Sequence, residues 1–211
     1  MRVALFGGSF DPPHRGHIAI ARAAADRFAL DQVLFAPVGL QPLKPHAATA
    51  SFEERLAMTT LACMDEPRFI PSTIDAARPD GRPNYTVDTL RLLHESMPGA
   101  QVFNLIGADS FLSLARWRNP QQLLELAEWI VVSRPGYSDQ SLLADPPGLI
   151  LTPAQRARIH PLSSIHEDIA ATNLRARLRS GDPCKDLLPP QVSGYIQHHH
   201  LYLSETDVTD N

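Results

Sequence analysis

The sequence lacks several features that would place it in a familiar class of protein. It has only two cysteines, Cys63 and Cys184, far apart and without a CxxC spacing, so neither a disulfide framework nor a zinc knuckle is expected. Its formal net charge of -4 argues against an extended nucleic-acid or anionic-membrane surface. No apolar run approaches the length of a membrane span or a signal-peptide core. We therefore expect a cytoplasmic protein that binds neither nucleic acid nor membrane.

What is present is an ordinary globular composition. Of the 211 residues, 44% are hydrophobic and 20% are charged, which excludes a disordered or fibrous chain. A chain of this length can bury a core without disulfides or metals to hold it together. We expect one domain over residues 1–203, followed by a polar, acidic tail at 204–211 that is frayed and disordered.

Short β-type runs alternate with helical patterns along most of the chain. Strands are predicted at residues 2–6, 32–36, 68–70, 101–106, 129–133 and 158–161. Helices are predicted at residues 16–28, 51–64, 86–96, 120–127, 153–158, 173–180 and 190–199, with an irregular stretch at 137–148. Several strands are apolar throughout, as in sheets with both faces buried. The alternation predicts an α/β fold: a Rossmann-like doubly wound, mainly parallel sheet with helices on both faces.

The first predicted strand leads into GGSFDPPHRGH, residues 7–17. Doubly wound sheets bind ligands at the carboxyl ends of their strands, but the common phosphate motifs GxGxxG and GxxxxGK[ST] are absent here. His14 and His17 are three positions apart and share one face of a first helical turn, whose free N–H groups attract an anion. The residues alone leave three interpretations open: an anion cradle, a capped turn with solvated histidines, or two metal ligands that lack a third partner.

The same stretch resembles the opening motif of the HxGH nucleotidylyltransferases. More narrowly, residues 2 to about 202 resemble the bacterial nicotinate-nucleotide adenylyltransferase family. The matching motifs follow in the family's order: KP at 44–45, PNYTVDTL at 83–90, GADS at 107–110, WR at 117–118, VSRPG at 132–136, LP at 188–189 and YI at 195–196. The opening motif specifies only the superfamily, whereas the later motifs separate this family from the shorter phosphopantetheine adenylyltransferases.

The resemblance implies an activity. It implies transfer of the adenylyl group of ATP to nicotinate mononucleotide, giving deamido-NAD (nicotinate adenine dinucleotide) and pyrophosphate in NAD biosynthesis, without a covalent intermediate. Mg2+ bound to ATP is the implied cofactor, and no metal site of the protein's own is expected. A nucleotide monophosphate has a second pKa of about 6, so the attacking phosphate is mostly dianionic at pH 7 and needs no general base. The oligomeric state is left open, a homo-oligomer included.

The resemblance also implies roles for individual residues. The catalytic set, on the phosphates of ATP, would be His14, His17, Lys44 and Arg175. The other ATP-binding residues would be Gly7, Gly8, Ser9, Phe10, Gly16, Gly107, Asp109, Ser133, Arg134 and Thr172. Among these, Asp109 would accept from a ribose hydroxyl and Thr172 would cap a late helix. The pyridine nucleotide would be held by Tyr85, Thr86, Trp117 and Arg118, with the indole as a stacking platform.

One segment departs from the family's pattern. Ala170 and Ala171 stand where the family usually carries hydroxyl residues before its late helix. Two alternatives to the adenylyltransferase therefore remain. One is another HxGH transferase, with nicotinamide mononucleotide or phosphopantetheine as acceptor. The other is a catalytically impaired nucleotide-binding module, which would bind ATP without turning it over.

Overall fold

The sheet confirms the predicted fold class. The structure is a computed structural model that describes residues 1–42, 49–133, 145–163 and 169–203. Within these residues the strands are β1 (Arg2–Gly8), β2 (Gln32–Pro37), β3 (Phe69–Pro71), β4 (Gln101–Gly107), β5 (Glu128–Val132) and β6 (Ile159–Leu162). They form one sheet in the order β3-β2-β1-β4-β5-β6, and every neighbouring pair is parallel. This is the doubly wound order, whose topological switch point lies between β1 and β4.

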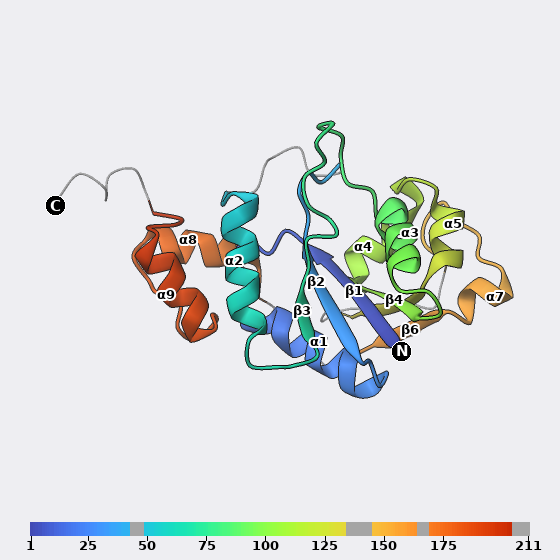
Figure 1. The fold of residues 1–211 in the computed structure, drawn as a ribbon, viewed down its shortest axis with the longest axis horizontal. Coiled ribbons are helices and arrows are strands. Elements are labelled where there is room, and N and C mark those ends of the chain that lie inside the picture. Colours follow the sequence, from blue (N-terminus) through green and yellow to red (C-terminus); the bar gives the residue numbers. More distant parts are fainter. Residues whose placement is uncertain (43–48, 134–144, 164–168, 204–211) are drawn as a thin grey trace.

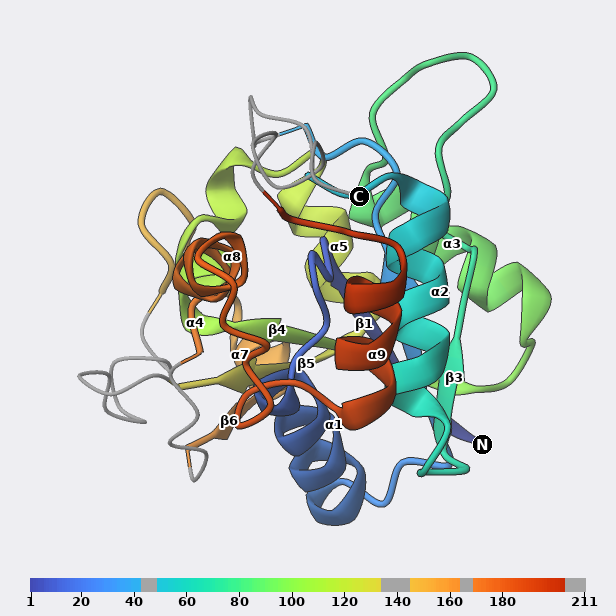
Figure 2. The same cartoon turned by 90° about the vertical axis from the view of Figure 1, so that its left-hand side faces the viewer.

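Helices cover the sheet on two sides, as Figures 1 and 2 show. The helical elements are α1 (Arg15–Arg27), α2 (Phe52–Cys63), α3 (Thr86–Ser96), α4 (Ala108–Leu112), η1 (Leu114–Arg116), α5 (Pro120–Leu126), α7 (Pro153–Arg156), α8 (Ala171–Arg179) and α9 (Pro190–His198). The sequence prediction finds each strand to within two residues, and α8 begins two residues earlier than predicted. The predicted irregular stretch falls mostly within 134–144, and that part and the tail at 204–211 lie outside the described residues.

Period-two alternation in the strands divides the core into two layers. In β1, Val3 and Leu5 pack with the buried residues of α3, α4 and α5 on one face. Ala4 and Phe6, pointing the other way, pack with the alanines of α1 on the opposite face. Because both faces of the central strand are covered, β1 is a buried apolar run that ends abruptly at its glycines.

A third apolar cluster joins the late helices to α2. Leu174 and Leu178 of α8 and Val192 and Ile196 of α9 pack with Met58 of α2. Both views show α9 lying along α2, and Figure 1 shows it far from α3 and α5 (Figures 1 and 2). The C-terminal part of the chain is thereby brought back to the side of the sheet where the opening loop lies.

Candidate active site

The opening loop lies at the carboxyl end of the central strand, next to the switch point. Strand β1 ends at Gly8, and α1 begins at Arg15 with His14 as its N-cap residue. The peptide bond between Asp11 and Pro12 is cis. The backbone N–H of Arg15 donates to the carbonyl of Leu187 at 2.8 Å, which ties the start of α1 to the segment before α9. The end of the loop is therefore fixed by a residue that lies far away in the sequence.

The two histidines form one unit at the start of α1, as their spacing predicts. Their rings are stacked, with centroids 3.6 Å apart, and the backbone N–H of His14 donates to Nδ1 of His17 at 3.1 Å. The ring of His17 also packs edge-on against Phe6 and Phe10. Nδ1 of His14 is buried and has no hydrogen-bond partner among the described residues.

Burial keeps both imidazoles neutral at pH 7. It lowers the pKa of His14 from 6.5 to about 4. Burial, together with the neighbouring His14, lowers the pKa of His17 well below 6.5. Since Nδ1 of His17 accepts a hydrogen bond, its proton must sit on Nε2. His17 therefore offers one N–H donor and no charge before a ligand binds.

A buried carboxylate, Asp11, organises the loop, and the sequence interpretation did not single it out. Its oxygens accept from the backbone N–H groups of Thr49 at 2.7 Å and Ala50 at 3.1 Å. The hydroxyl of Tyr202 donates to Asp11 Oδ1 at 2.7 Å, and the carboxylate raises the pKa of that hydroxyl together with burial, which is the larger cause. The only hint in the sequence was that Asp11 stands inside the opening motif, since its partners lie far along the chain.

Two arginines from other elements reach the same loop. Arg175, on α8, donates from Nη1 to the carbonyl oxygen of Asp11 at 2.8 Å and lies 3.9 Å from Asp11 Oδ2. Arg55, on α2, is buried and donates from Nη1 to the carbonyl oxygen of Ser9 at 2.8 Å. The structure thus brings Arg175 to the histidine loop as predicted, and it adds Arg55, which no sequence signal had indicated.

The N-terminal turn of α8 differs from the prediction. The helix begins at Ala171, and its N-cap residue is Ala170, which forms no side-chain cap. Thr172 is therefore an exposed second residue of the helix and not its cap, so the predicted capping role is wrong. The reason is that the N–H of Leu174 donates to the carbonyl of Ala170 at 3.0 Å, which closes the first helical turn around Thr172.

The other predicted ATP-side residues are distributed over three strand ends. Gly7 and Gly8 end β1, Gly107 and Asp109 stand at the junction of β4 and α4, and Ser133 directly follows β5. A Cβ on Gly8 would come within 3.3 Å of the Phe10 ring. Phe10 as a whole is 1% exposed and has φ 47°, so it packs in the interior behind the loop. Ser133 is buried and donates its N–H to Leu162, while Lys44 and Arg134 lie outside the described residues.

A cavity of about 480 Å³ opens on the other face of the sheet, beside the switch point. Its walls include the ends of β1 and β4, the start of α3 and the segment before α5. Four predicted pyridine-binding residues, Tyr85, Thr86, Trp117 and Arg118, line it together. Gly7 and Gly8 line it as well, so the cavity and the histidine loop meet at the end of β1. Its volume is that of a small-ligand site.

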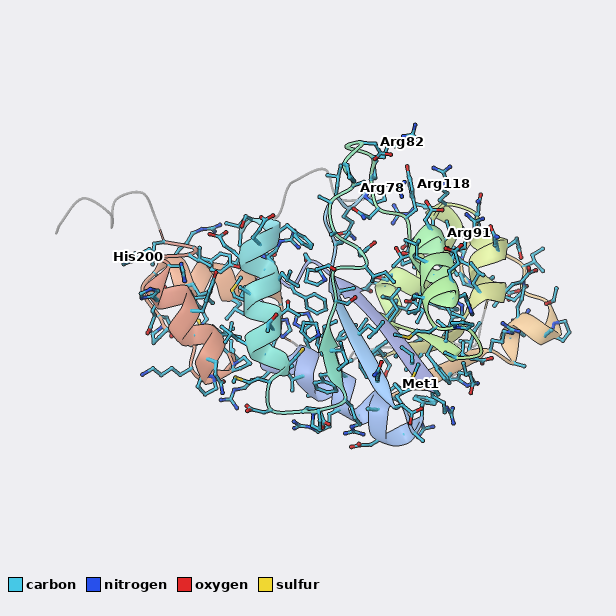
Figure 3. The ribbon with its side chains drawn as sticks, viewed as in Figure 1. Met1, Arg78, Arg82, Arg91, Arg118 and His200 are labelled. Carbon is cyan, nitrogen blue, oxygen red and sulfur yellow. The ribbon has the colours of Figure 1, made fainter. Side chains whose placement is uncertain are left out.

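Aromatic and cationic side chains form one wall of this cavity. The Arg118 guanidinium carbon lies 4.6 Å from the centroid of the Tyr85 ring, a cation–π contact. Trp117 donates from Nε1 to Ser113 Oγ at 3.3 Å and contacts Trp129 edge-on. Figure 3 shows Arg118 projecting on the side of the molecule that carries α3 and α5. This wall therefore offers aromatic rings for stacking beside the positive charge of Arg118.

A second group of cavity-lining side chains is polar and is hydrogen-bonded to the chain around it. Thr89 Oγ1 donates to Asp75 Oδ1 at 2.8 Å, and burial raises the pKa of the Asp75 carboxyl. The Asn84 side chain accepts from the N–H of Leu40 at 3.0 Å and donates to the carbonyl of Ala76 at 2.8 Å. Asn84 therefore fixes the segment before α3 against the segment after β2, and the cavity has a defined shape without a ligand.

Two further observations bear on ligand type and location. Among the described residues there is no group of three or more His, Cys, Asp or Glu side chains placed to hold a metal ion. In the same part of the chain, no helix has the length and apolar character needed to cross a membrane.

Comparison with known proteins identifies the relatives of this chain. A family model described as cytidylyltransferase-like matches residues 5–177. A relative from Gloeobacter violaceus, named "Probable nicotinate-nucleotide adenylyltransferase", is 42% identical over 204 residues, covering 95% of this chain and 96% of its own. A relative of the same name from Corynebacterium kroppenstedtii is 39% identical over 207 residues, covering 98% and 93%.

Solved structures share the fold at low sequence identity. The Plasmodium falciparum nicotinic acid mononucleotide adenylyltransferase in complex with NaAD superimposes with a TM-score of 0.75 at 16% identity, covering 95% of this chain and 97% of the other. A second structure of that enzyme, with APC bound, gives 0.73 at 16% identity, with coverage of 95% and 96%. With about 40% identity to its relatives over nearly the whole length, the chain belongs to the nicotinate-nucleotide adenylyltransferase family of nucleotidyltransferases.

Proposed function

We propose that this protein transfers the adenylyl group of ATP to nicotinate mononucleotide, releasing pyrophosphate and forming deamido-NAD in the cytoplasm. One observation supports this more than any other. A neutral, stacked histidine pair on one face of the sheet and an aromatic, arginine-bearing cavity on the other meet at Gly7 and Gly8. A triphosphate and a mononucleotide bound in these two places would have their reacting phosphates brought together at the end of β1.

The histidine loop suits the phosphates of ATP. The Nε2–H of His17 and the N-terminal turn of α1 offer donors to phosphate oxygens, and negative charge grows on the leaving pyrophosphate during the reaction. Arg175 and Lys44 would add positive charge on the same side. Arg175 is held at the loop by the Asp11 carbonyl, which leaves the rest of its guanidinium fork for the β- and γ-phosphates.

The acceptor side suits a pyridine nucleotide. The Trp117 ring would stack on the pyridine, and the N-terminal N–H groups of α3, at Thr86, would donate to the carboxylate. Arg118, held against Tyr85, would make the electrostatic environment favourable for an acid. The relatives are named nicotinate-nucleotide adenylyltransferases, and the structural neighbour is a nicotinic acid mononucleotide adenylyltransferase with NaAD bound. These names support the same acceptor here.

The chemical step requires positioning and charge stabilisation. An oxygen of the mononucleotide phosphate, already mostly dianionic at pH 7, attacks the α-phosphorus of ATP, and the bond from that phosphorus to pyrophosphate breaks. No proton has to be removed from the nucleophile, which agrees with histidines whose pKa values lie below 6.5. We propose that Mg2+ arrives bound to ATP, because it prefers phosphate oxygens and retains waters; when bound it neutralises phosphate charge.

The test is product analysis with purified protein, ATP and Mg2+, and with nicotinate mononucleotide, nicotinamide mononucleotide or phosphopantetheine as acceptor. We expect stoichiometric pyrophosphate and dinucleotide with nicotinate mononucleotide, and less with the other two. Faster turnover of another acceptor would reassign the substrate. ATP binding without product from any acceptor would favour the alternative based on Ala170 and Ala171, a catalytically impaired nucleotide-binding module.

A further inference from the structure

The acceptor cavity contains a buried amide for which the reaction described so far has no use. Asn104 lies on β4, in register with Leu5 of β1 and Trp129 of β5. Its strand neighbours on the same face, Val102 and Ile106, belong to the apolar cluster under α3, α4 and α5. Asn104 is 2% exposed and lines the cavity. It is a polar side chain in an otherwise apolar strand face.

The amide nitrogen of Asn104 has no partner. Its Nδ2 is buried without a hydrogen bond among the described residues, and so is Nε1 of Trp129 on the next strand. A buried donor without an acceptor is destabilising, so such groups are retained where a water or a ligand oxygen completes them. Only Asn104 of the two lines the cavity, so a ligand in the cavity can reach Asn104.

The position of Asn104 indicates which part of the ligand it meets. Gly7, Gly8 and Gly107 mark the phosphate end of the cavity, where it meets the histidine loop. Asn104 lies three residues before Gly107, which is about 10 Å further down the strand at the usual rise per residue. A mononucleotide with its phosphate at the glycines has its base at the other end, so the ring substituent is the part directed at Asn104.

We propose that Asn104 is a specificity-determining residue, and that its amide N–H donates to a carboxylate oxygen on the ring of the acceptor nucleotide. The inference rests on the proposed function and adds to it a contact in the depth of the cavity. The charge of the neighbouring cavity residues explains why a donor is favourable at this position. Asp75, which also lines the cavity, is an acceptor already engaged by Thr89. A second carboxylate at position 104 would therefore add another negative charge to the cavity that receives the substrate carboxylate.

The experiment compares two variants of nearly the same size. Asn104→Leu removes the donor and continues the apolar face, and we expect it to raise KM for nicotinate mononucleotide about tenfold with KM for ATP unchanged. Asn104→Asp replaces the donor by an acceptor. It should lower kcat/KM for nicotinate mononucleotide about 100-fold and that for nicotinamide mononucleotide less, because a carboxamide can donate to the new carboxylate.

Val102→Ala is the matched control. Val102 is buried on the same strand and face but does not line the cavity, so its truncation should lower the melting temperature and leave both KM values unchanged. A purely structural Asn104, completed by a water shared with Trp129, would make Asn104→Leu behave like this control. A KM for nicotinate mononucleotide within twofold of the parent in Asn104→Leu overturns the inference.

Binding separates this inference from the proposed reaction. Calorimetric titration with nicotinate mononucleotide alone measures the contact without turnover, and Asn104→Leu should weaken the Kd about tenfold. If the parent binds the mononucleotide and Asn104→Leu weakens it, the inference stands even where no pyrophosphate is released. If the parent does not bind the mononucleotide, or both proteins bind it equally, the inference is wrong.

Discussion

The buried carboxylate of the histidine loop and the buried amide of the acceptor cavity differ in how their hydrogen bonds are satisfied. Around Asp11, the carboxylate oxygens bind Thr49, Ala50 and Tyr202, and the carbonyl binds Arg175. In the acceptor cavity, the buried Nδ2 of Asn104 has no partner among the described residues. The Asp11 carboxylate is thus satisfied by the protein itself, whereas the Asn104 amide leaves a donor for a ligand of the cavity.

This difference matches two different tasks. Stabilising charge that develops on a leaving group requires donors whose positions are fixed before the reaction begins. Discriminating between similar acceptors requires groups whose hydrogen bonds depend on which acceptor is bound. Variants of the loop should therefore change stability or kcat, and variants of the cavity should change KM.

Removing the Asp11 carboxylate should have the largest effect on the fold. Asp11→Ala leaves two backbone N–H groups and a tyrosine hydroxyl without their acceptor, so we expect the free energy of unfolding to fall by about 3 kcal/mol or more. Urea denaturation measures the change. Tyr202→Phe removes one of the same bonds and should cost about 1 kcal/mol. Equal losses in the two variants would contradict the central place of Asp11.

Acidification should weaken the histidine loop next. Since burial lowers the pKa of His14 to about 4, the unfolded chain takes up a proton between pH 6.5 and 4 that the folded chain does not. The free energy of unfolding should therefore fall with pH by about 1.4 kcal/mol per pH unit in this range, from His14 alone. His14→Gln should flatten the profile measured by denaturation at pH 4.5 to 7.5. An unchanged slope would show that His14 titrates normally.

His17→Ala tests the catalytic part of the comparison. Loss of a donor needed most in the transition state should lower kcat about 100-fold and change KM for ATP little. Steady-state kinetics with ATP varied gives both numbers. His160→Ala is the control, because His160 pairs with Glu128 on the β5–β6 side of the sheet and should leave kcat unchanged. Equal losses in kcat and ATP affinity would assign His17 to ground-state binding.

Trp117→Ala should have the smallest effect and should be confined to the acceptor. Base stacking on an aromatic ring is worth about 1–3 kcal/mol, so KM for nicotinate mononucleotide should rise about tenfold while KM for ATP stays constant. Trp117→Phe keeps a ring in place and should recover most of the loss. A rise in KM for ATP of the same size would mean that the two halves of the site are not separate.

Much of this architecture could be predicted because the signals are local. Apolar runs such as residues 3–6 and 129–132 indicate buried parallel strands, and the motif at residues 7–17 falls where β1 ends. The spacing of His14 and His17 sufficed to place both on the first turn of α1. The cavity brought together the four residues that the resemblance had assigned to the pyridine nucleotide.

The rest depends on contacts between distant parts of the chain. Asp11 and Tyr202 are 191 positions apart, and neither residue type indicates the other. The sequence analysis placed Asn104 within a predicted strand and assigned it no role, and only the cavity in the structure brings its amide to a possible ligand space. The start of α8 was predicted two residues late, because the N–H of Leu174 bonds to the carbonyl of Ala170, a residue whose side chain cannot cap a helix. The one-domain organisation stays a prediction, as do the individual site roles.

The hydrogen bond between Tyr202 and Asp11 also has a consequence for protein synthesis. The ribosome makes Tyr202 191 positions after Asp11. A nascent chain therefore carries the whole histidine motif long before it carries the hydroxyl that binds its central carboxylate. The hydrogen bonds of the Asp11 carboxylate are therefore complete only after α9 and the residues up to Tyr202 have been made and α9 has docked along α2.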